Sequence, residues 1–270
     1  MKYGFIMPGG PLDAIVEAGT AAEAAGWDGY FYYDHDAGAG ASDPWVVLAA
    51  VALRTERVRL GAVLVPLPWR RPWLVARALT TLDHLSGGRM ILPIGLGAVE
   101  EEDWARGATA LGEVVDRKQR AALMDEGLAV ITGLWSGQPL SHRGEHYQVE
   151  LPAFRTPVQR PRIPIWVVGA WGRPKSMRRV LRYDGWLPAG IDDADWPAAR
   201  RYLDTRAPKD LTFDLVIEGR TPGDDSAKAH KILRPYASAG ATWWLETMWS
   251  APNDPSDALV RIRQGPPRLE

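Results

Sequence analysis

The chain has 270 residues, 24% of them charged and 46% hydrophobic, and a formal net charge of −1 at pH 7. This composition is typical of a globular protein with a large core, and so small a net charge provides no field that would gather nucleic-acid phosphates or acidic lipids. The absence of cysteine excludes disulfides, thiolate catalysis and thiolate metal sites.

Short apolar runs alternate along the chain with longer segments of helical periodicity, a pattern typical of repeated β-α units. Eight such units are expected, with strands at residues 2–7, 29–33, 58–65, 90–96, 165–169, 185–187, 213–218 and 242–245. We therefore predict a (β/α)8 TIM barrel that spans residues 1–270 as a single domain.

Two of the expected helices have apolar residues at helical spacing, which predicts a face packed against the barrel. In the third helix, which Pro72 starts, these residues are Leu74, Ala78, Leu82 and Leu85. In the fourth helix they are Met124, Leu128, Ile131 and Leu134.

Residues 135–164, between the fourth helix and the fifth strand, contain scattered Gly and Pro and no sustained period. The segment is too long for an ordinary connection and too short for a domain. We expect an insertion outside the barrel, with a hairpin around Arg143 and Gly144.

In barrel enzymes the loops after the strands carry the chemistry, and Asp34 and His35 follow the second expected strand. A histidine titrates near neutrality, so His35 is a candidate to donate, accept or orient a proton. A histidine hydrogen-bonded to the backbone, with only a structural role, is an equally open interpretation.

The turn after the fifth expected strand combines glycine with basic side chains: Gly169, Ala170, Trp171, Gly172, Arg173 and Lys175. Glycine lets backbone N–H groups approach a ligand at a helix start, where a phosphate is favoured. Many such turns contain glycine for geometric reasons alone.

Carboxylates near the fourth, seventh and eighth strands favour a competing class, because barrel glycosidases pair two acidic groups about 5–10 Å apart. Glu100 with Glu218 or Glu246 forms the candidate pair. However, Glu100 begins a run of acidic residues, which is typical of a solvated surface.

A metal site is not expected. His142 and His146 have the i, i+4 spacing of a zinc pair, but Gly144 lies between them in the irregular insertion. No glutamate follows the first histidine as it does in the metalloprotease motif.

Residues 43–97 resemble the central stretch of the luciferase-like monooxygenases and their deazaflavin-dependent relatives. The matching motifs are the strand TERVRLG, the helix start WRRPW and the helix end LDHLSGGR. The later pieces LMDEGLAVITGLWSG, PRIPIWVVGAWG, RRVLRYDGWLP and AGATWWLE resemble family segments in the same order. The resemblance therefore covers nearly the whole chain.

The resemblance implies a barrel with an insertion and a reduced FMN or coenzyme F420 across the barrel mouth. It implies that Asp34 and His35 lie beside the reactive ring, where His35 supplies a proton or hydrogen bond and Asp34 sets its tautomer. The other residues expected to contact the coenzyme are the bulge Ala62, Val63 and Leu64, often with a non-prolyl cis peptide, Gly97, and the turn from Gly169 to Gly172. Arg173 and Lys175 are expected to neutralise its phosphate.

Two departures from the family pattern leave the substrate open. Some deazaflavin-dependent relatives carry a glutamate after the strand-four glycine motif, where this chain has Ala98 and Val99. The loop after His35, DAGAGAS, lacks side chains of the kind that contact substrates in the family. FMN and F420 also remain equally open.

We predict an oxidoreductase that transfers a hydride or activates oxygen on a small organic substrate. The family and the 13 tryptophans favour a homodimer, and a separate flavin or F420 reductase is an implied partner. The apolar run near the N-terminus is too short for a signal peptide and no stretch is long enough to span a membrane, so a cytoplasmic location is expected. The alternatives are a barrel hydrolase and a coenzyme-binding protein without catalysis.

Overall fold

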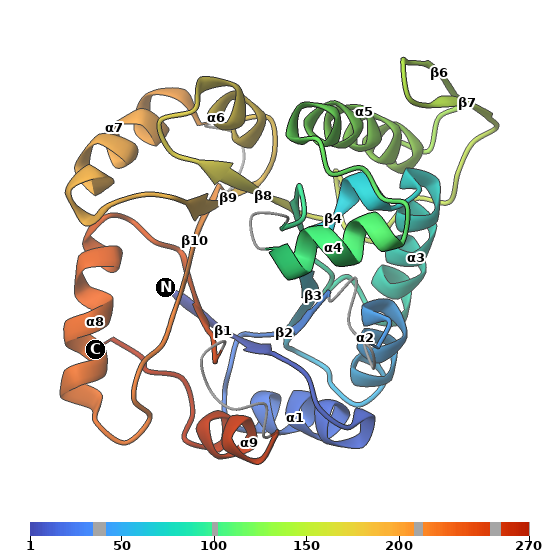
Figure 1. The fold of residues 1–270 in the computed structure, drawn as a ribbon. Coiled ribbons are helices and arrows are strands. Elements are labelled where there is room, and N and C mark those ends of the chain that lie inside the picture. Colours follow the sequence, from blue (N-terminus) through green and yellow to red (C-terminus); the bar gives the residue numbers. More distant parts are fainter. Residues whose placement is uncertain (35–41, 99–101, 208–212, 249–254, 270) are drawn as a thin grey trace.

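The computed structural model in Figure 1 describes residues 1–34, 42–98, 102–207, 213–248 and 255–269. In these residues, nine parallel strands form one sheet in the order β3-β2-β1-β11-β10-β9-β8-β5-β4. Their bounds are β1 Lys2–Met7, β2 Gly29–Tyr33, β3 Arg59–Val63, β4 Val65–Pro66, β5 Leu92–Gly95, β8 Ile165–Ala170, β9 Gly185–Ala189, β10 Asp214–Gly219 and β11 Trp243–Glu246.

The sheet curls into a nearly closed barrel. Its two end strands, β3 and β4, are separated by one residue and together form the third strand of the barrel. The nine strands of the sheet therefore correspond to eight barrel strands. Leu60 of β3 forms an isolated parallel bridge to Met90, just before β5, which joins the two ends of the sheet. The (β/α)8 fold expected from the sequence is therefore confirmed.

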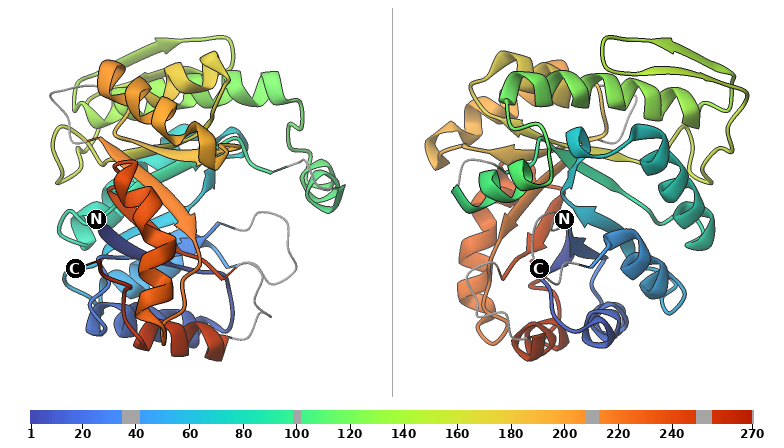
Figure 2. Two further views of the ribbon diagram at one scale, coloured as in Figure 1. Left: turned by 90° about the vertical axis from the view of Figure 1, so that its left-hand side faces the viewer. Right: turned by 45° about the vertical axis from the view of Figure 1, so that its right-hand side comes forward.

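Helices surround the strands in Figures 1 and 2. They are α1 Leu12–Ala24, α2 Pro44–Ala52, α3 Pro72–Leu85, α4 Glu102–Ala110, α5 Arg117–Trp135, α6 Pro174–Val180, α7 Trp196–Arg206, α8 Ser226–Ser238 and α9 Pro255–Arg263, with 3-10 turns η1 Leu67–Trp69 and η2 Asp193–Asp195. The local sequence explains where several of these helices begin. Asp43 caps α2 by accepting hydrogen bonds from the N–H groups of Trp45 and Val46, and proline is the first residue of α2, α3 and α6.

The expected inner face of α5 is correct, but that of α3 is wrong except at Leu82. Leu74 and Leu85 are 46% and 43% exposed. The buried apolar residues of α3 are Val75, Ala76, Leu79 and Leu82. The helix carries two overlapping apolar stripes, and its contacts with α2 on one side and α5 on the other decide which stripe is covered.

The hairpin expected around Arg143 and Gly144 is present. β6 (Leu140–Arg143) and β7 (Gln148–Leu151) pair antiparallel as a sheet separate from the barrel, on the outer side of α5 in Figure 1. The Glu126 carboxylate of α5 holds the turn by accepting hydrogen bonds from His146 N (2.9 Å), Tyr147 N (2.6 Å) and His142 Nε2 (3.1 Å).

Large apolar side chains from the strands pack together inside the barrel. Trp166 and Trp243 meet with ring centroids 5.2 Å apart, and Phe31 lies 5.6 Å from Trp166. A Cβ at Gly4 would approach the Phe31 ring to 2.6 Å, so glycine is needed there to accommodate the aromatic cluster. Because side chains fill the barrel, a ligand has room only beyond this packed core.

Candidate active site

A cavity of about 420 Å³ lies at the carboxyl ends of the strands. Its walls come from the ends of β2, β3, β4, β5, β8, β9 and β10, from the first residue of α5 and from α6. This is the end of the barrel at which barrel enzymes carry their active sites, and the volume is that of a small-molecule site. Val63, Leu64, Gly97 and Ala170, which were expected to contact a coenzyme, all line it.

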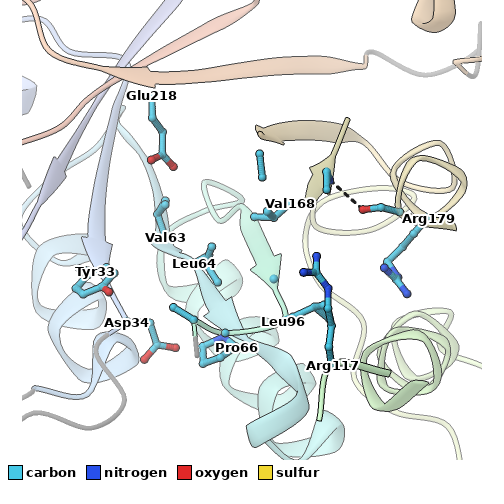
Figure 3. A pocket seen from close by; sticks show the side chains of 16 residues that line it. Tyr33, Asp34, Val63, Leu64, Pro66, Leu96, Arg117, Val168, Arg179 and Glu218 are labelled. Atoms are coloured by element: carbon cyan, nitrogen blue, oxygen red, sulfur yellow. Dashed lines mark hydrogen bonds between the residues drawn. The ribbon is translucent and has the colours of Figure 1, made fainter. Parts of the chain in front are cut away.

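The cavity has different chemistry on its different sides. Figure 3 shows Tyr33 and Asp34 on one side and Arg117 and Arg179 on the other. Apolar side chains such as Leu64 lie between them. The arrangement suits a flat apolar group that carries an anionic substituent on the arginine side.

The wall formed by the third barrel strand contains a non-prolyl cis peptide between Val63 and Leu64. It separates β3 from β4 and lies within the segment from Ala62 to Leu64 where such a peptide was expected. Val63 and Leu64 line the cavity, whereas Ala62 is buried among residues of the core outside the barrel.

Asp34 is held by Arg70, a residue that the sequence reasoning did not single out. Arg70 Nη2 lies 2.6 Å from Asp34 Oδ1, and Arg70 Nε lies 3.1 Å from Asp34 Oδ2. The side chains are 1% exposed for Asp34 and 26% exposed for Arg70. This two-point pairing matches the planar fork of guanidinium to the carboxylate and fixes its orientation at the cavity wall. His35, the expected proton-transferring residue, lies outside the described residues.

Only part of the turn after β8 lines the cavity, and the rest contacts other side chains. Ala170 lines the cavity, but Gly169 and Trp171 do not, because successive side chains of a strand point to opposite sides. The Gly169 carbonyl accepts a hydrogen bond from Trp186 Nε1 (2.8 Å). The Trp171 ring packs against Trp186 and Tyr202, with centroids 5.9 and 5.8 Å apart.

Gly172, Arg173 and Lys175 lie in a second depression of about 890 Å³ that adjoins the cavity. The two spaces share Leu96, Arg117, Ser176 and Arg179. Ser176 Oγ accepts a hydrogen bond from Ala170 N (3.0 Å), which ties the turn after β8 to the start of α6. The expected phosphate-neutralising side chains are therefore beside the cavity.

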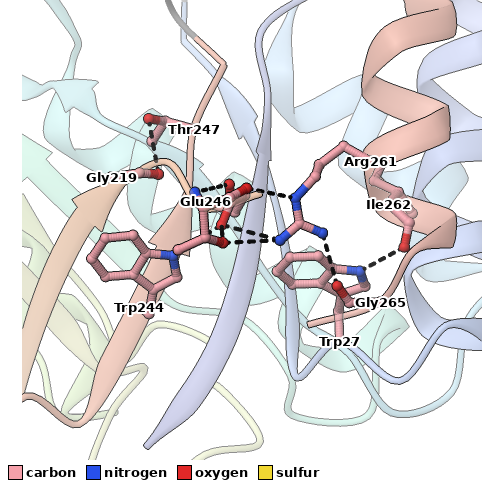
Figure 4. Close-up of polar contacts among 9 residues, drawn as sticks. Trp27, Gly219, Trp244, Glu246, Thr247, Arg261, Ile262 and Gly265 are labelled. Atoms are coloured by element: carbon pink, nitrogen blue, oxygen red, sulfur yellow. Dashed lines mark hydrogen bonds and ion pairs between the residues drawn. The ribbon is translucent and has the colours of Figure 1, made fainter. Parts of the chain in front are cut away.

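Of the carboxylates in the hydrolase hypothesis that the structure describes, Glu218 lines this cavity and Glu246 does not. The Glu218 side chain points into the space in Figure 3. Glu246 is completely buried and accepts hydrogen bonds from Thr221 N (2.6 Å), Thr221 Oγ1 (2.6 Å) and Trp244 Nε1 (3.0 Å). Figure 4 shows this carboxylate with Trp244 and Arg261 around it. Arg261 Nη2 is 3.3 Å from the same carboxylate, which makes Glu246 a structural residue. Glu100 lies outside the described residues.

Three residues that line the cavity were not foreseen as site residues: Tyr33, Arg117 and Ser176. Tyr33 had a sequence signal, since it is the last residue of the second expected strand. Arg117 begins α5, and no local pattern indicates that this helix start reaches the barrel mouth.

Among the described residues, no three His, Asp or Glu side chains are grouped so that they could hold a metal ion. His142 Nε2 lies instead 3.1 Å from the Glu126 carboxylate. No helix of the described chain is both long enough and apolar enough to cross a membrane.

The fold and the cavity together define a barrel protein with a small-molecule site at its carboxyl end. A family model described as luciferase-like monooxygenase matches residues 3–257. The chain belongs to this family, as the sequence resemblance indicated.

Related curated proteins include F420-dependent glucose-6-phosphate dehydrogenases. The one from Nakamurella multipartita is 30% identical over 295 residues, with 94% of this chain and 83% of that protein covered. The one from Beutenbergia cavernae is 35% identical, with 82% and 68% covered. The chain spans 66% and 58% of the length of those from Segniliparus rotundus and Amycolatopsis mediterranei.

Solved structures share the fold. Monooxygenase RslO1 from Streptomyces bottropensis has a TM-score of 0.74 at 18% identity, with 98% of this chain and 97% of that chain covered. The coenzyme F420 dependent tetrahydromethanopterin reductase from Methanopyrus kandleri has a TM-score of 0.74 at 16% identity, with 97% of each chain covered. At these identities the likeness concerns the fold alone.

Proposed function

We propose that this chain binds a reduced FMN or coenzyme F420 in the cavity at the barrel mouth and uses it to reduce or oxygenate a small organic substrate. It is an oxidoreductase of the luciferase-like family that uses a flavin-type coenzyme. Relatives named for F420 dependence support this class. The observation that carries the proposal is the cavity itself, with apolar walls between a fixed carboxylate and a pair of arginines.

The residues present fit such a coenzyme. Val63, Leu64 and Val168 provide apolar surface for a flat ring and exclude water from it. Arg173 and Lys175 line the depression that adjoins the cavity, which supports their proposed role in neutralising a phosphate on the ring's side chain. The coenzyme supplies a hydride or, as FMN, activates oxygen, while the protein supplies binding, orientation and a proton.

The proton role is proposed for His35, with Asp34 as the residue that orients it. Arg70 fixes the Asp34 carboxylate from the side of α3, so the residue next to His35 in the chain has a defined position. A carboxylate that accepts a hydrogen bond from an imidazole sets its tautomer and stabilises its protonated form.

The direct test is a titration with FMN and with F420, monitored by tryptophan fluorescence. Ala170→Trp should fill the cavity and weaken binding of both coenzymes by about tenfold or more, because it replaces ligand space with a large ring. Ala129→Trp, on the exposed side of α5, is the matched control and should bind normally. If the wild-type chain binds neither coenzyme, the proposal is wrong; if it binds one but turns over no substrate, the alternative of binding without catalysis is favoured.

A homodimer is proposed through α2. This helix, PWVVLAAVA, has no charged residue, and its Val46 and the following Leu53 are 71% and 70% exposed. A helix that is apolar all round is normally covered, here by a second copy of the chain. Val46→Glu should give a monomer in light scattering, whereas Val260→Glu on α9 should not change the mass.

The cytoplasmic location and the separate reductase stay predictions.

A further inference from the structure

Strand β10 places a carboxylate on the inner side of the barrel mouth. Val216 belongs to the cluster packed inside the barrel, whereas Leu215 and Ile217 belong to the core outside it. Side chains alternate along a strand, so Glu218, two residues after Val216, lies on the inner side one step nearer the mouth. Glu218 is exposed and lines the cavity, directly beyond the packed interior.

The charges around the cavity are divided between its sides. The charged residues among the described lining are Asp34, Glu218, Arg117 and Arg179. Asp34 is held by Arg70, and Arg179 by Asp125, each in a two-point ion pair. Figure 3 shows Glu218 across the space from both arginines. A ligand group that lies near β10 therefore meets a carboxylate, whereas the guanidinium groups lie at the other part of the space.

The lining between these charges is apolar, with Val63, Leu64 and Val168 exposed to the same space. A carboxylate accepts hydrogen bonds and donates none. In partly apolar surroundings its best partner is a group that donates a hydrogen bond and also carries positive charge. An ammonium group meets both conditions and a hydroxyl meets only the first. A carboxylate or a phosphate on the ligand meets neither.

The neighbouring strand β11 shows how a structural glutamate is held in this barrel. Glu246 is fully buried, and Thr221, Trp244 and Arg261 surround its carboxylate. Glu218 is exposed to the cavity instead, so its carboxylate is accessible to a ligand.

We infer that Glu218 is a specificity-determining residue and that the substrate of this chain is an amine with an apolar body. The ammonium group of the substrate binds the Glu218 carboxylate, and its apolar part lies against Leu64 and Val168. The inference rests on the proposed function, because a bound amine is a substrate only if a coenzyme shares the cavity with it. Water reaches the exposed carboxylate, so the attraction weakens as ionic strength rises.

Three probes of similar shape test the inference: benzylamine, which is protonated at neutral pH, benzyl alcohol and benzoate. Their dissociation constants are measured by ligand-observed NMR on the wild-type chain, alone and saturated with whichever coenzyme it binds. Benzylamine should bind about 3- to 10-fold more tightly than benzyl alcohol, as expected for a charge-assisted hydrogen bond at a site that water reaches. Benzoate should bind most weakly. The preference for the amine should shrink as salt is raised from about 20 to about 500 mM.

One substitution isolates the carboxylate. Glu218→Gln keeps the shape of the side chain and removes its charge, so the preference for benzylamine should disappear while coenzyme affinity stays within about twofold of wild type. Glu150→Gln makes the same change in net charge at an exposed position of β7 outside the cavity and should keep the preference. Equal affinity for benzylamine and benzyl alcohol, no binding of benzylamine, or an unchanged preference in Glu218→Gln would each overturn the inference.

The coenzyme-saturated chain separates a substrate contact from a coenzyme contact. Benzylamine should bind together with the coenzyme, and displacement of one by the other would overturn the role of Glu218 in substrate recognition. Failure of the proposed function gives a different result, because the wild-type chain would then bind neither FMN nor F420. The three probes on the chain alone would still decide whether Glu218 selects an amine.

Discussion

Replacing Arg70 by alanine should both destabilise the protein and lower its turnover. Asp34 is 1% exposed and receives two hydrogen bonds from the Arg70 guanidinium, so the variant leaves a buried carboxylate without this cation. Breaking a buried ion pair from one side costs about 3–5 kcal/mol. Arg70 itself is 26% exposed, which lets water reach the gap, so we expect a smaller loss of about 2–3 kcal/mol, at or below the bottom of that range.

The size of the coupling can be measured with a double-mutant cycle in urea unfolding. Asp34→Asn removes the charge that needs Arg70, so Arg70→Ala combined with Asp34→Asn should be less destabilised than the sum of the two single variants, by about 1 kcal/mol or more. Arg70→Lys should fall between wild type and alanine, because an ammonium cannot make the two-point contact. A loss below about 0.5 kcal/mol in Arg70→Ala, with additive single effects, would refute the assigned role of this pair.

Three further outcomes are expected. His35→Ala should lower kcat by about 10²–10⁴-fold with a much smaller change in coenzyme Kd, and Asp34→Asn should lower kcat in the same direction; near-normal turnover would exclude the proton role. Burial acts to raise the pKa of Glu126, but hydrogen bonds from the backbone N–H groups of His146 and Tyr147 lower it overall. Its stabilisation is therefore present above the unfolded pKa near 4.5 and lost as pH falls, so Glu126→Gln should show a flatter loss of stability between pH 7 and pH 3 than wild type. EDTA should leave coenzyme binding and turnover unchanged, and recovery by added zinc after a loss would contradict this.

The strands were predictable because each is a short apolar run bounded by turn residues. The expected and observed strands agree within a few residues at every position along the barrel. The third differs most, since the expected strand 58–65 is divided between β3 and β4 at the Val63–Leu64 peptide. Periodicity also failed to choose between the two apolar stripes of α3, because the choice depends on the neighbouring helices.

The site was predictable only as far as strand ends determine it. Asp34 and Ala170 follow from their positions after the ends of strands, whereas Val63 was indicated by the family resemblance. Side chains alternate along β8, so Ala170 faces the cavity and its two neighbours do not. The prediction that all residues of this turn contact the coenzyme did not take this alternation into account. The partner of Asp34 lies 36 residues away, and the tertiary structure alone brings the guanidinium to it. The tertiary structure alone likewise brings the first residue of α5 to the barrel mouth.

Substitutions of Glu218 in β10 and Glu246 in β11 distinguish an oxidoreductase from a hydrolase by experiment. Glu246 is bound by Thr221, Trp244 and Arg261 and is fully buried, so Glu246→Gln should cost about 2–4 kcal/mol of stability through the uncompensated arginine. Coenzyme affinity per folded molecule should not change. Glu218 is exposed to the cavity, so Glu218→Gln should leave thermal stability within about 0.5 kcal/mol of wild type and act on ligand binding instead. A hydrolase that paired Glu246 with Glu100 would lose turnover in Glu246→Gln, with this variant as stable as wild type. That result would reject the structural role given to Glu246 and restore the hydrolase as the better interpretation of this barrel.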